Sequence, residues 1–290
     1  DRPQVELHVH LEGSIRPETL LKLAERNRVE LPAKDVDGLR EWYRFRDFPH
    51  FVEVYVSASR CIRSAEDIEL IAREFAEGQK AQNIHHTEAT YTARTIENYA
   101  GIPWPEQREA LRRAVRYARE ELGMSIQFIL DIGRGDPPER AVEIARWCIE
   151  AQGDPVCALG IAGIEMSTPA GVYHEAFGLA REAGVPVIPH AGETKGAESV
   201  WDALEATQPN RIGHGIRCLE DPKLVDTLRE GQVTLEVCPS SNVCLGAAPS
   251  WEEPPLPDLL NEGLLVTLNS DDPPMFGTTL TDELERAVHT

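Results

Sequence analysis

The stretch Gln4–Leu11, with the sequence QVELHVHL, is an apolar, strand-like run that contains two histidines near its end. Seven similar runs follow along the chain: Asn83–Thr92, Ser125–Ile132, Val156–Ile161, Val185–His190, Arg211–His214, Val233–Cys238 and Leu264–Asn269. Several of them are almost continuously apolar, as is typical of parallel strands that are buried on both faces. The sequence therefore predicts eight parallel strands.

Amphipathic helical stretches lie between these runs, including Pro17–Asn27, Ala65–Gln79, Trp104–Leu122, Pro138–Gln152, Gly171–Ala183 and Asp221–Glu230. The alternation of strand and helix predicts an α/β fold of the (β/α)8 type, a TIM barrel. The long interval between the first two runs predicts extra helices at Ala33–Trp42 and Phe48–Ile62. Because no interdomain linker interrupts the pattern, we expect residues 1–290 to form a single barrel domain.

The composition narrows the class of protein. The net charge is −20, from 49 acidic and 29 basic residues, and no basic run is present, which argues against nucleic acid or an anionic membrane as a partner. The six cysteines form no CxxC pair and are typical of reduced residues in a cytoplasmic protein. We therefore expect a cytoplasmic protein that acts on a small molecule, as a monomer or a homo-oligomer.

Histidines and carboxylates follow the predicted strands at the end where a (β/α)8 barrel carries its active site. His8 and His10 are two apart on a strand, so both side chains point to the same face. Glu193 follows His190 by three residues, and one of the two could bind a metal while the other acts as acid or base. Together these side chains are the inventory of a hydrolase that activates water on a divalent ion.

Two further motifs complete this inventory. His214 ends the sixth run between two glycines, which permit close approach of a neighbouring strand or a ligand. Asp271 and Asp272 follow the eighth run, and one of them could bind the metal while the other acts on water or substrate. No lysine lies in the fourth run, so a single metal ion is expected rather than a lysine-bridged pair. The histidine-rich set favours Zn²⁺, although Fe²⁺, Mn²⁺ or Co²⁺ could also occupy it.

In combination, these motifs make the chain resemble the adenosine deaminase family of metal-dependent amidohydrolases. The signatures are HVHLEGS at 8–14, AGIE at 162–165, HAGET at 190–194, RIGHG at 211–215, VCPSSN at 237–242 and NSDDP at 269–273. The resemblance implies a set of metal ligands: His8, His10, His190 and Asp271. It also implies hydrolytic deamination of a 6-aminopurine to the 6-oxopurine and ammonia.

The same resemblance implies roles for the other motif residues. Glu193 would donate a proton to N1 of the purine, and His214 would orient the attacking water and help to deprotonate it. Asp272 would hydrogen-bond N7, and the backbone N–H of Gly163 would contact N3. Because Glu193 must start protonated, we expect its pKa to be raised by burial and by neighbouring negative charge.

Two departures from the family's usual pattern bear on the substrate. Adenosine deaminases in the narrow sense usually carry an aspartate that reaches the ribose 5′-hydroxyl where this chain has Glu12, and a second aspartate where it has Gly160. Both departures argue against plain adenosine as the substrate, and Glu12 is expected to contact the substrate that is used instead. Adenine deaminases share the glutamate, so the free base is an alternative substrate.

The segment YRFRDF at 43–48 resembles bacterial relatives that deaminate 6-aminodeoxyfutalosine in menaquinone synthesis. We expect Phe48 and Phe51 to contact the substrate, and Arg44 or Arg46 could meet the carboxylate of such a molecule. The alternative, which the sequence favours, is the start of a helix with surface arginines over aromatic core residues. Another mononuclear amidohydrolase activity on the same barrel remains a further alternative. A metal-binding barrel without catalysis is the least favoured reading, because Glu193 and Asp272 are both present.

Overall fold

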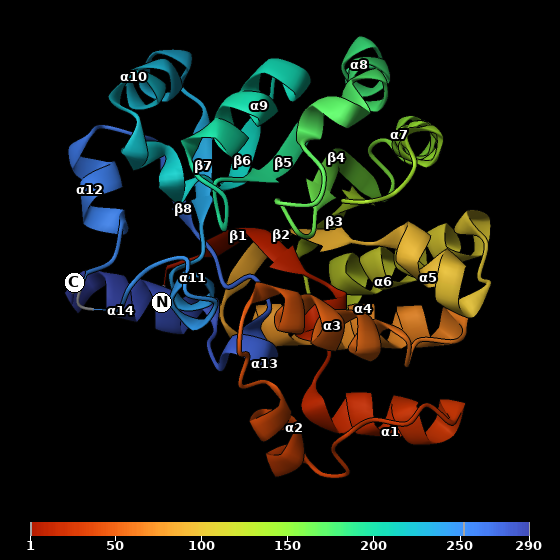
Figure 1. Cartoon of the computed structure of the whole chain (residues 1–290). Coiled ribbons are helices and arrows are strands. Elements are labelled where there is room, and N and C mark those ends of the chain that lie inside the picture. The colour runs from red at the N-terminus through yellow and green to blue at the C-terminus, as the bar shows by residue number, and fades with distance from the viewer. Residues whose placement is uncertain (1, 252, 290) are drawn as a thin grey trace.

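The computed structural model describes residues 2–251 and 253–289, and eight parallel strands form its barrel (Figure 1). The strands are β1 Gln4–His10, β2 Ile84–Tyr91, β3 Ser125–Gly133, β4 Val156–Ala162, β5 Val187–Ala191, β6 Arg211–His214, β7 Thr234–Val237 and β8 Val266–Leu268. Each strand pairs in parallel with the next one in chain order. The predicted (β/α)8 fold is confirmed.

The barrel closes where the last aspartate motif meets the first strand. Val9 forms a bridge with Asp271, the His10 N–H donates to the Asp271 carbonyl oxygen at 2.8 Å, and the Asp271 N–H donates to the His8 carbonyl oxygen at 3.2 Å. The Asn269 side chain accepts from the backbone N–H of His8 at 3.1 Å. The closure therefore joins two motifs that are more than 250 residues apart in the sequence.

Helices surround the strands (Figure 1). Their bounds are α1 Pro17–Asn27, α2 Val36–Trp42, α3 Phe48–Ser59, α4 Ala65–Ala81, α5 Ala93–Ala100, α6 Trp104–Glu121, α7 Pro138–Ala151, α8 His174–Glu182, α9 Ala197–Thr207, α10 Pro222–Gly231, α11 Pro239–Cys244, α12 Leu256–Asn261, α13 Pro273–Phe276 and α14 Leu280–His289. Three short 3-10 helices are η1 Glu12–Ser14, η2 Ala170–Tyr173 and η3 Ile216–Glu220. None of the described helices is long and apolar enough to cross a membrane.

The extra helices predicted between the first two strands are α2 and α3. Helix α3 begins after Asp47, whose side chain accepts a hydrogen bond from the His50 N–H at 2.8 Å, and Pro49 occupies its first turn. It ends at Ser59, three residues before the predicted end. The predicted helix Gly171–Ala183 is divided into η2 and α8. Helix α9 had no counterpart among the helices named from the sequence.

Candidate active site

The four predicted metal ligands meet at the C-terminal mouth of the barrel. His8 and His10 lie on β1, His190 lies on β5, and Asp271 follows β8. The Asp271 Oδ1 atom lies 3.2 Å from His10 Nε2 and 3.5 Å from His8 Nε2. The Nε2 atoms of His10 and His190 are 3.2 Å apart. All four side chains are buried, so the structure brings the predicted set together.

Two of the imidazole rings have a hydrogen-bond acceptor of the protein next to Nδ1, on the side away from the predicted metal cluster. The Glu236 Oε2 atom lies 2.9 Å from His8 Nδ1, and the Ile161 carbonyl oxygen lies 3.0 Å from His190 Nδ1. A proton held on Nδ1 leaves Nε2 as a lone-pair donor. The buried Nε2 atom of His8 has no hydrogen-bond partner among the described residues. Converging imidazole nitrogens beside a buried carboxylate are a donor set that fits one divalent cation.

The backbone is strained where two site residues turn into the barrel mouth. His214 has φ 61° and Asp271 has φ 63°, in the left-handed region that non-glycine residues seldom occupy. Between the ligands, Gly213 leaves no room for a side chain, because a Cβ atom there would lie 2.7 Å from Cε1 of His8. These positions hold the site side chains at short mutual distances.

Glu165 holds the loop that carries Glu193. Its carboxylate accepts hydrogen bonds from the backbone N–H groups of Gly192, Glu193 and Thr194 at 2.8, 2.9 and 2.7 Å. The Ser199 hydroxyl also donates to it. Although burial opposes ionisation, these bonds hold the pKa of Glu165 below its usual value. The glutamate of the AGIE motif therefore shapes the loop that follows β5.

The carboxyl groups near the predicted metal cluster differ in the direction in which their pKa values are shifted. Burial, together with the negative charges of Asp271 and Glu165, raises the pKa of Glu193 well above its usual value. Burial and the adjacent Asp271 likewise raise the pKa of Asp272. Although burial opposes its ionisation, the adjacent imidazole rings of His10 and His8 hold the pKa of Asp271 well below its usual value. Ionisation is thus favoured at Asp271 and opposed at Glu193 and Asp272.

His214 faces these groups with Nε2. That atom lies 3.7 Å from Oε2 of Glu193 and 3.9 Å from Oδ2 of Asp271. Burial lowers the pKa of His214 to about 3, so the ring is neutral at neutral pH. The Nδ2 atom of Asn242 lies 3.2 Å from Nδ1, while Oδ1 of the same amide has no hydrogen-bond partner among the described residues. Turning the amide over places Oδ1 at Nδ1, where it accepts from the Nδ1–H group and leaves Nε2 free to accept a proton.

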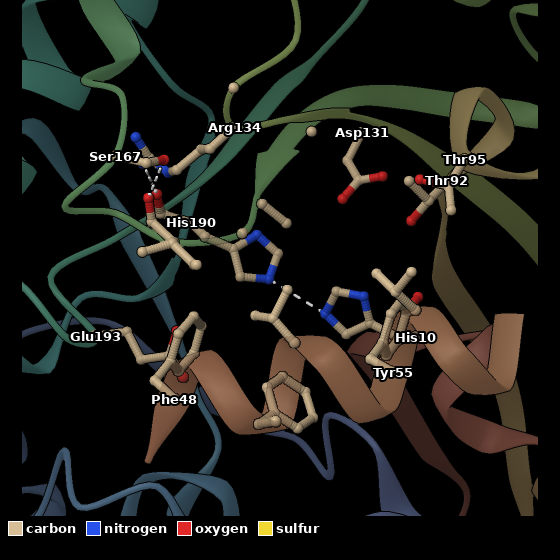
Figure 2. Close-up of a pocket in the computed structure, with 18 of the residues that line it drawn as sticks. His10, Phe48, Tyr55, Thr92, Thr95, Asp131, Arg134, Ser167, His190 and Glu193 are labelled. Atoms are coloured by element: carbon tan, nitrogen blue, oxygen red, sulfur yellow. Dashed lines mark hydrogen bonds between the residues drawn. The ribbon is translucent and has the colours of Figure 1, made fainter. Parts of the chain in front are cut away.

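A cavity of about 360 Å³ opens over these side chains (Figure 2). This volume lies in the lower part of the range of small-molecule sites, which is about 300–1,000 Å³. Helix α3 supplies an apolar wall that consists of Phe48, Phe51, Val52, Tyr55 and Val56. The predicted substrate contacts at Phe48, Phe51 and Gly163 all line the cavity.

Glu12 lies apart from the other predicted contacts. It is buried, but the Tyr55 hydroxyl donates to its Oε2 atom at 3.1 Å and the Thr92 N–H donates to its Oε1 atom at 2.9 Å. It is not among the described residues that line the cavity, so its direct contact with a substrate stays a prediction. The oxygens that would have to reach the substrate are bound within the protein.

The two arginines proposed to meet a substrate carboxylate lie on the surface. Arg44 is exposed and forms an ion pair of 3.0 Å with Glu41, and Arg46 is also exposed. Neither is among the described residues that line the cavity. The basic side chain that does line it is Arg134, which donates to the His190 carbonyl oxygen at 2.8 Å.

Several residues at the site were not predicted from the sequence. Glu236 and Asn242 orient the histidine rings, while Tyr55, Asp131 and Arg134 line the cavity. The sequence did contain an indication of two of these residues. Glu236 and Asp131 each interrupt an otherwise apolar end of a strand-like run, VTLEVC and FILDI, and a charge buried in a barrel strand calls for a partner.

Comparisons with known proteins agree with this geometry. The family model described as adenosine deaminase matches residues 3–290. An adenine deaminase from Crocosphaera subtropica is 36% identical over 97% of this chain and 85% of that protein. An aminodeoxyfutalosine deaminase from Streptomyces avermitilis is 37% identical over 97% of this chain and 79% of that protein.

Solved structures of related proteins also match this chain over nearly its full length. The crystal structure of an adenine deaminase from Arthrobacter aurescens superposes with a TM-score of 0.93 at 34% identity, covering 100% of this chain and 88% of that one. An amidohydrolase from Burkholderia ambifaria, with bound zinc, has a TM-score of 0.89 at 26% identity and covers 98% of this chain and 79% of that one. Since the family model spans almost all residues, the chain belongs to the adenosine deaminase family.

Proposed function

We propose that the chain is a zinc-dependent enzyme that hydrolyses the 6-amino group of a purine to give the 6-oxopurine and ammonia. One observation carries this proposal: a buried Glu193, whose pKa is raised, lies 3.7 Å from the neutral His214 at the edge of the predicted metal cluster. The arrangement places a proton donor and a proton acceptor side by side in one cavity.

The metal would be held by His8, His10, His190 and Asp271. When bound, zinc lowers the pKa of water towards about 7 and so supplies a nucleophile at neutral pH. The zinc in the related amidohydrolase from Burkholderia ambifaria supports the choice of metal.

Glu193 serves as the general acid. Because burial and neighbouring carboxylates raise its pKa and so favour its protonated form, it can donate to N1 of the purine, which draws electrons away from C6. C6 then accepts the oxygen of the attacking water. General acid catalysis of this kind contributes about 10²- to 10⁴-fold.

His214 and Asp272 supply the remaining proton transfer and hydrogen bond. Through Nε2, the neutral His214 orients the water, accepts its proton and passes a proton towards the departing amine. Burial and Asp271 raise the pKa of Asp272, which favours the protonated form that donates a hydrogen bond to N7 of the purine. The C6–N bond breaks, and ammonia leaves with the bonding electron pair. The proton of the new C6 hydroxyl returns to the Glu193 carboxylate, which gives the 6-oxopurine and restores the acid.

Two substrates have specific support. The free base adenine is supported by Glu12, whose oxygens are bound to Tyr55 and Thr92 rather than left for a sugar, and by the relatives named adenine deaminase. The second candidate, 6-aminodeoxyfutalosine, is supported by the apolar wall of α3, which suits an aromatic 5′ substituent, and by the Streptomyces relative.

The test is to load the protein with zinc and to follow ultraviolet spectra with adenine, adenosine and 6-aminodeoxyfutalosine side by side. We expect conversion of at least one of them to its 6-oxopurine, with release of one ammonia per product. If none is converted although bound zinc is confirmed, the proposed function is wrong.

A further inference from the structure

Asp131 is a buried carboxylate in the cavity wall that the proposed mechanism does not use. It lies near the end of β3 and is 3% exposed. Its Oδ1 atom is buried and has no hydrogen-bond partner among the described residues, although the side chain lines the cavity. Figure 2 shows the carboxylate on the side of Thr92 and Thr95, with Glu193 on the other side of the His10–His190 pair.

A buried acceptor without a donor costs free energy, so such positions call for an explanation. Burial, with a contribution from the negative charge of Glu12, raises the pKa of Asp131 to about 7, although the charge on His10 and a hydrogen bond from the Thr92 side chain oppose this. The neighbouring strand offers no donor side chain, because Asp131 pairs with Gly160. A Cβ atom at position 160 would lie 3.1 Å from the Ile188 carbonyl oxygen, so a side chain there would crowd the neighbouring backbone.

Glu12 lies in the same corner of the site, which is the region around Asp131 and Thr92, but both of its carboxylate oxygens already accept hydrogen bonds from the protein. Tyr55 and Thr92 donate to the two oxygens of that carboxylate. Position 12 is where adenosine deaminases in the narrow sense place the aspartate that reaches the sugar. In this chain, the carboxylate oxygen left open at the corner is therefore Oδ1 of Asp131.

We propose that Asp131 determines specificity by accepting a hydrogen bond from an N–H or O–H group on the N9 side of the purine. The inference rests on the proposed function, which places N1 of the purine at Glu193. The donor is then the N9–H of a free base or a hydroxyl of a sugar attached at N9. The cavity also contains Asp136, Asp271 and Asp272, whereas Arg134 already donates to two backbone carbonyl oxygens. The corner thus selects a neutral donor and disfavours an anionic group such as a nucleotide phosphate.

The experiment compares wild type with Asp131→Ala on adenine, adenosine and 9-methyladenine, the last of which has no donor on its N9 side. Values of kcat/KM are measured, or inhibition constants for a compound that is not converted. We expect Asp131→Ala to weaken the donor-bearing compound about 10- to 100-fold, mainly through KM, and to leave 9-methyladenine within about twofold. A loss with adenine assigns the donor to N9–H, and a loss with adenosine alone assigns it to the sugar.

Asp136→Asn is the matched control, because Asp136 also lines the cavity but its Oδ2 atom already accepts from the Gly133 N–H at 3.2 Å. Zinc content and thermal unfolding are recorded for each variant to exclude loss of metal or fold. The inference is overturned if Asp131→Ala affects all three compounds alike or none of them. If wild-type enzyme with bound zinc converts none of the three or 6-aminodeoxyfutalosine, the failure belongs to the proposed function instead.

Discussion

The Nδ1 atom of His8 lies 2.9 Å from Oε2 of Glu236, and Arg211 donates to the other oxygen of the same carboxylate. Arg211 also pairs with Glu88 across the barrel interior. A chain of hydrogen bonds and ion pairs thus connects His8 in the predicted metal cluster, through Glu236 and Arg211, to Glu88. Because Glu236 fixes the tautomer and the orientation of His8, it should contribute to metal affinity without touching the metal.

We expect Glu236→Ala to weaken zinc binding about 10- to 100-fold, as is typical when the partner of a metal-bound histidine is lost. The measurement is competition for zinc with a chelator of known affinity. Glu88→Ala is the matched control, because Glu88 pairs with the same arginine but forms no hydrogen bond with His8. Equal losses in the two variants would show that only the ion-pair network, and not the contact with His8, supports the metal.

Gly13 lies against the carboxyl group of Asp272. A Cβ atom on residue 13 would lie 1.6 Å from Oδ1 of Asp272, so Gly13→Ala must displace that side chain. We expect kcat/KM to fall about 100-fold, since misplacing a reacting group by about 1 Å has this effect. Gly78→Ala on α4 is the control, because no heavy atom lies within 4 Å of its Cβ atom. It should keep full activity and gain up to about 1 kcal/mol of stability. Retained activity in Gly13→Ala would contradict the proposed role of Asp272.

The barrel and the clustering of its candidate metal ligands could be predicted from the sequence because both follow local rules. Parallel strands that are buried on both faces read as apolar runs, and barrel topology places whatever follows each strand at one mouth. This rule brings His8, His10, His190 and Asp271 to one mouth, and the family resemblance then names them as the predicted ligands. In the structure, neighbouring atoms of this set lie 3.2 to 3.5 Å apart. The same rule located Glu193.

The residues that surround this set depend on contacts between strands that are distant in the sequence. Nothing near His8 in the sequence indicates that Glu236 orients it, because the two are 228 residues apart. For Arg44, the local sequence alone could not distinguish a residue that contacts the substrate from one on the surface. Charged residues near helix ends are usually solvated, and here Arg44 pairs with Glu41 on the surface. Side-chain partners in the barrel interior follow from the register of the strands, which the sequence pattern does not specify.

Arg134 offers a test of Glu193 as the acid. Its positive charge lowers the pKa of Glu193, in opposition to burial and to Asp271, which raise it. The active form of Glu193 is protonated, so activity is lost as pH rises through its pKa. Removing the positive charge in Arg134→Gln raises that pKa further and should move the alkaline limb of kcat/KM to higher pH.

Arg134→Lys keeps the charge and should leave that limb in place, even if the rate falls because the bond to the His190 carbonyl oxygen is altered. The measurement is the pH profile of kcat/KM for the three proteins. A shift of the alkaline limb to lower pH in Arg134→Gln would mean that another group controls it.

The response of variants to metal removal distinguishes the predicted metal ligands from the predicted proton donor. Zinc at a hundredfold excess over its dissociation constant stabilises the folded state by about 2.7 kcal/mol, so a chelator should lower the melting temperature by several degrees and abolish activity. Asp271→Asn removes a carboxylate oxygen beside two histidines and should lose most of this zinc response. Glu193→Gln should keep the full zinc response but lose about 10²- to 10⁴-fold in kcat. If the melting temperature of Glu193→Gln no longer responds to zinc, Glu193 belongs to the metal site, and its role as the proton donor is wrong.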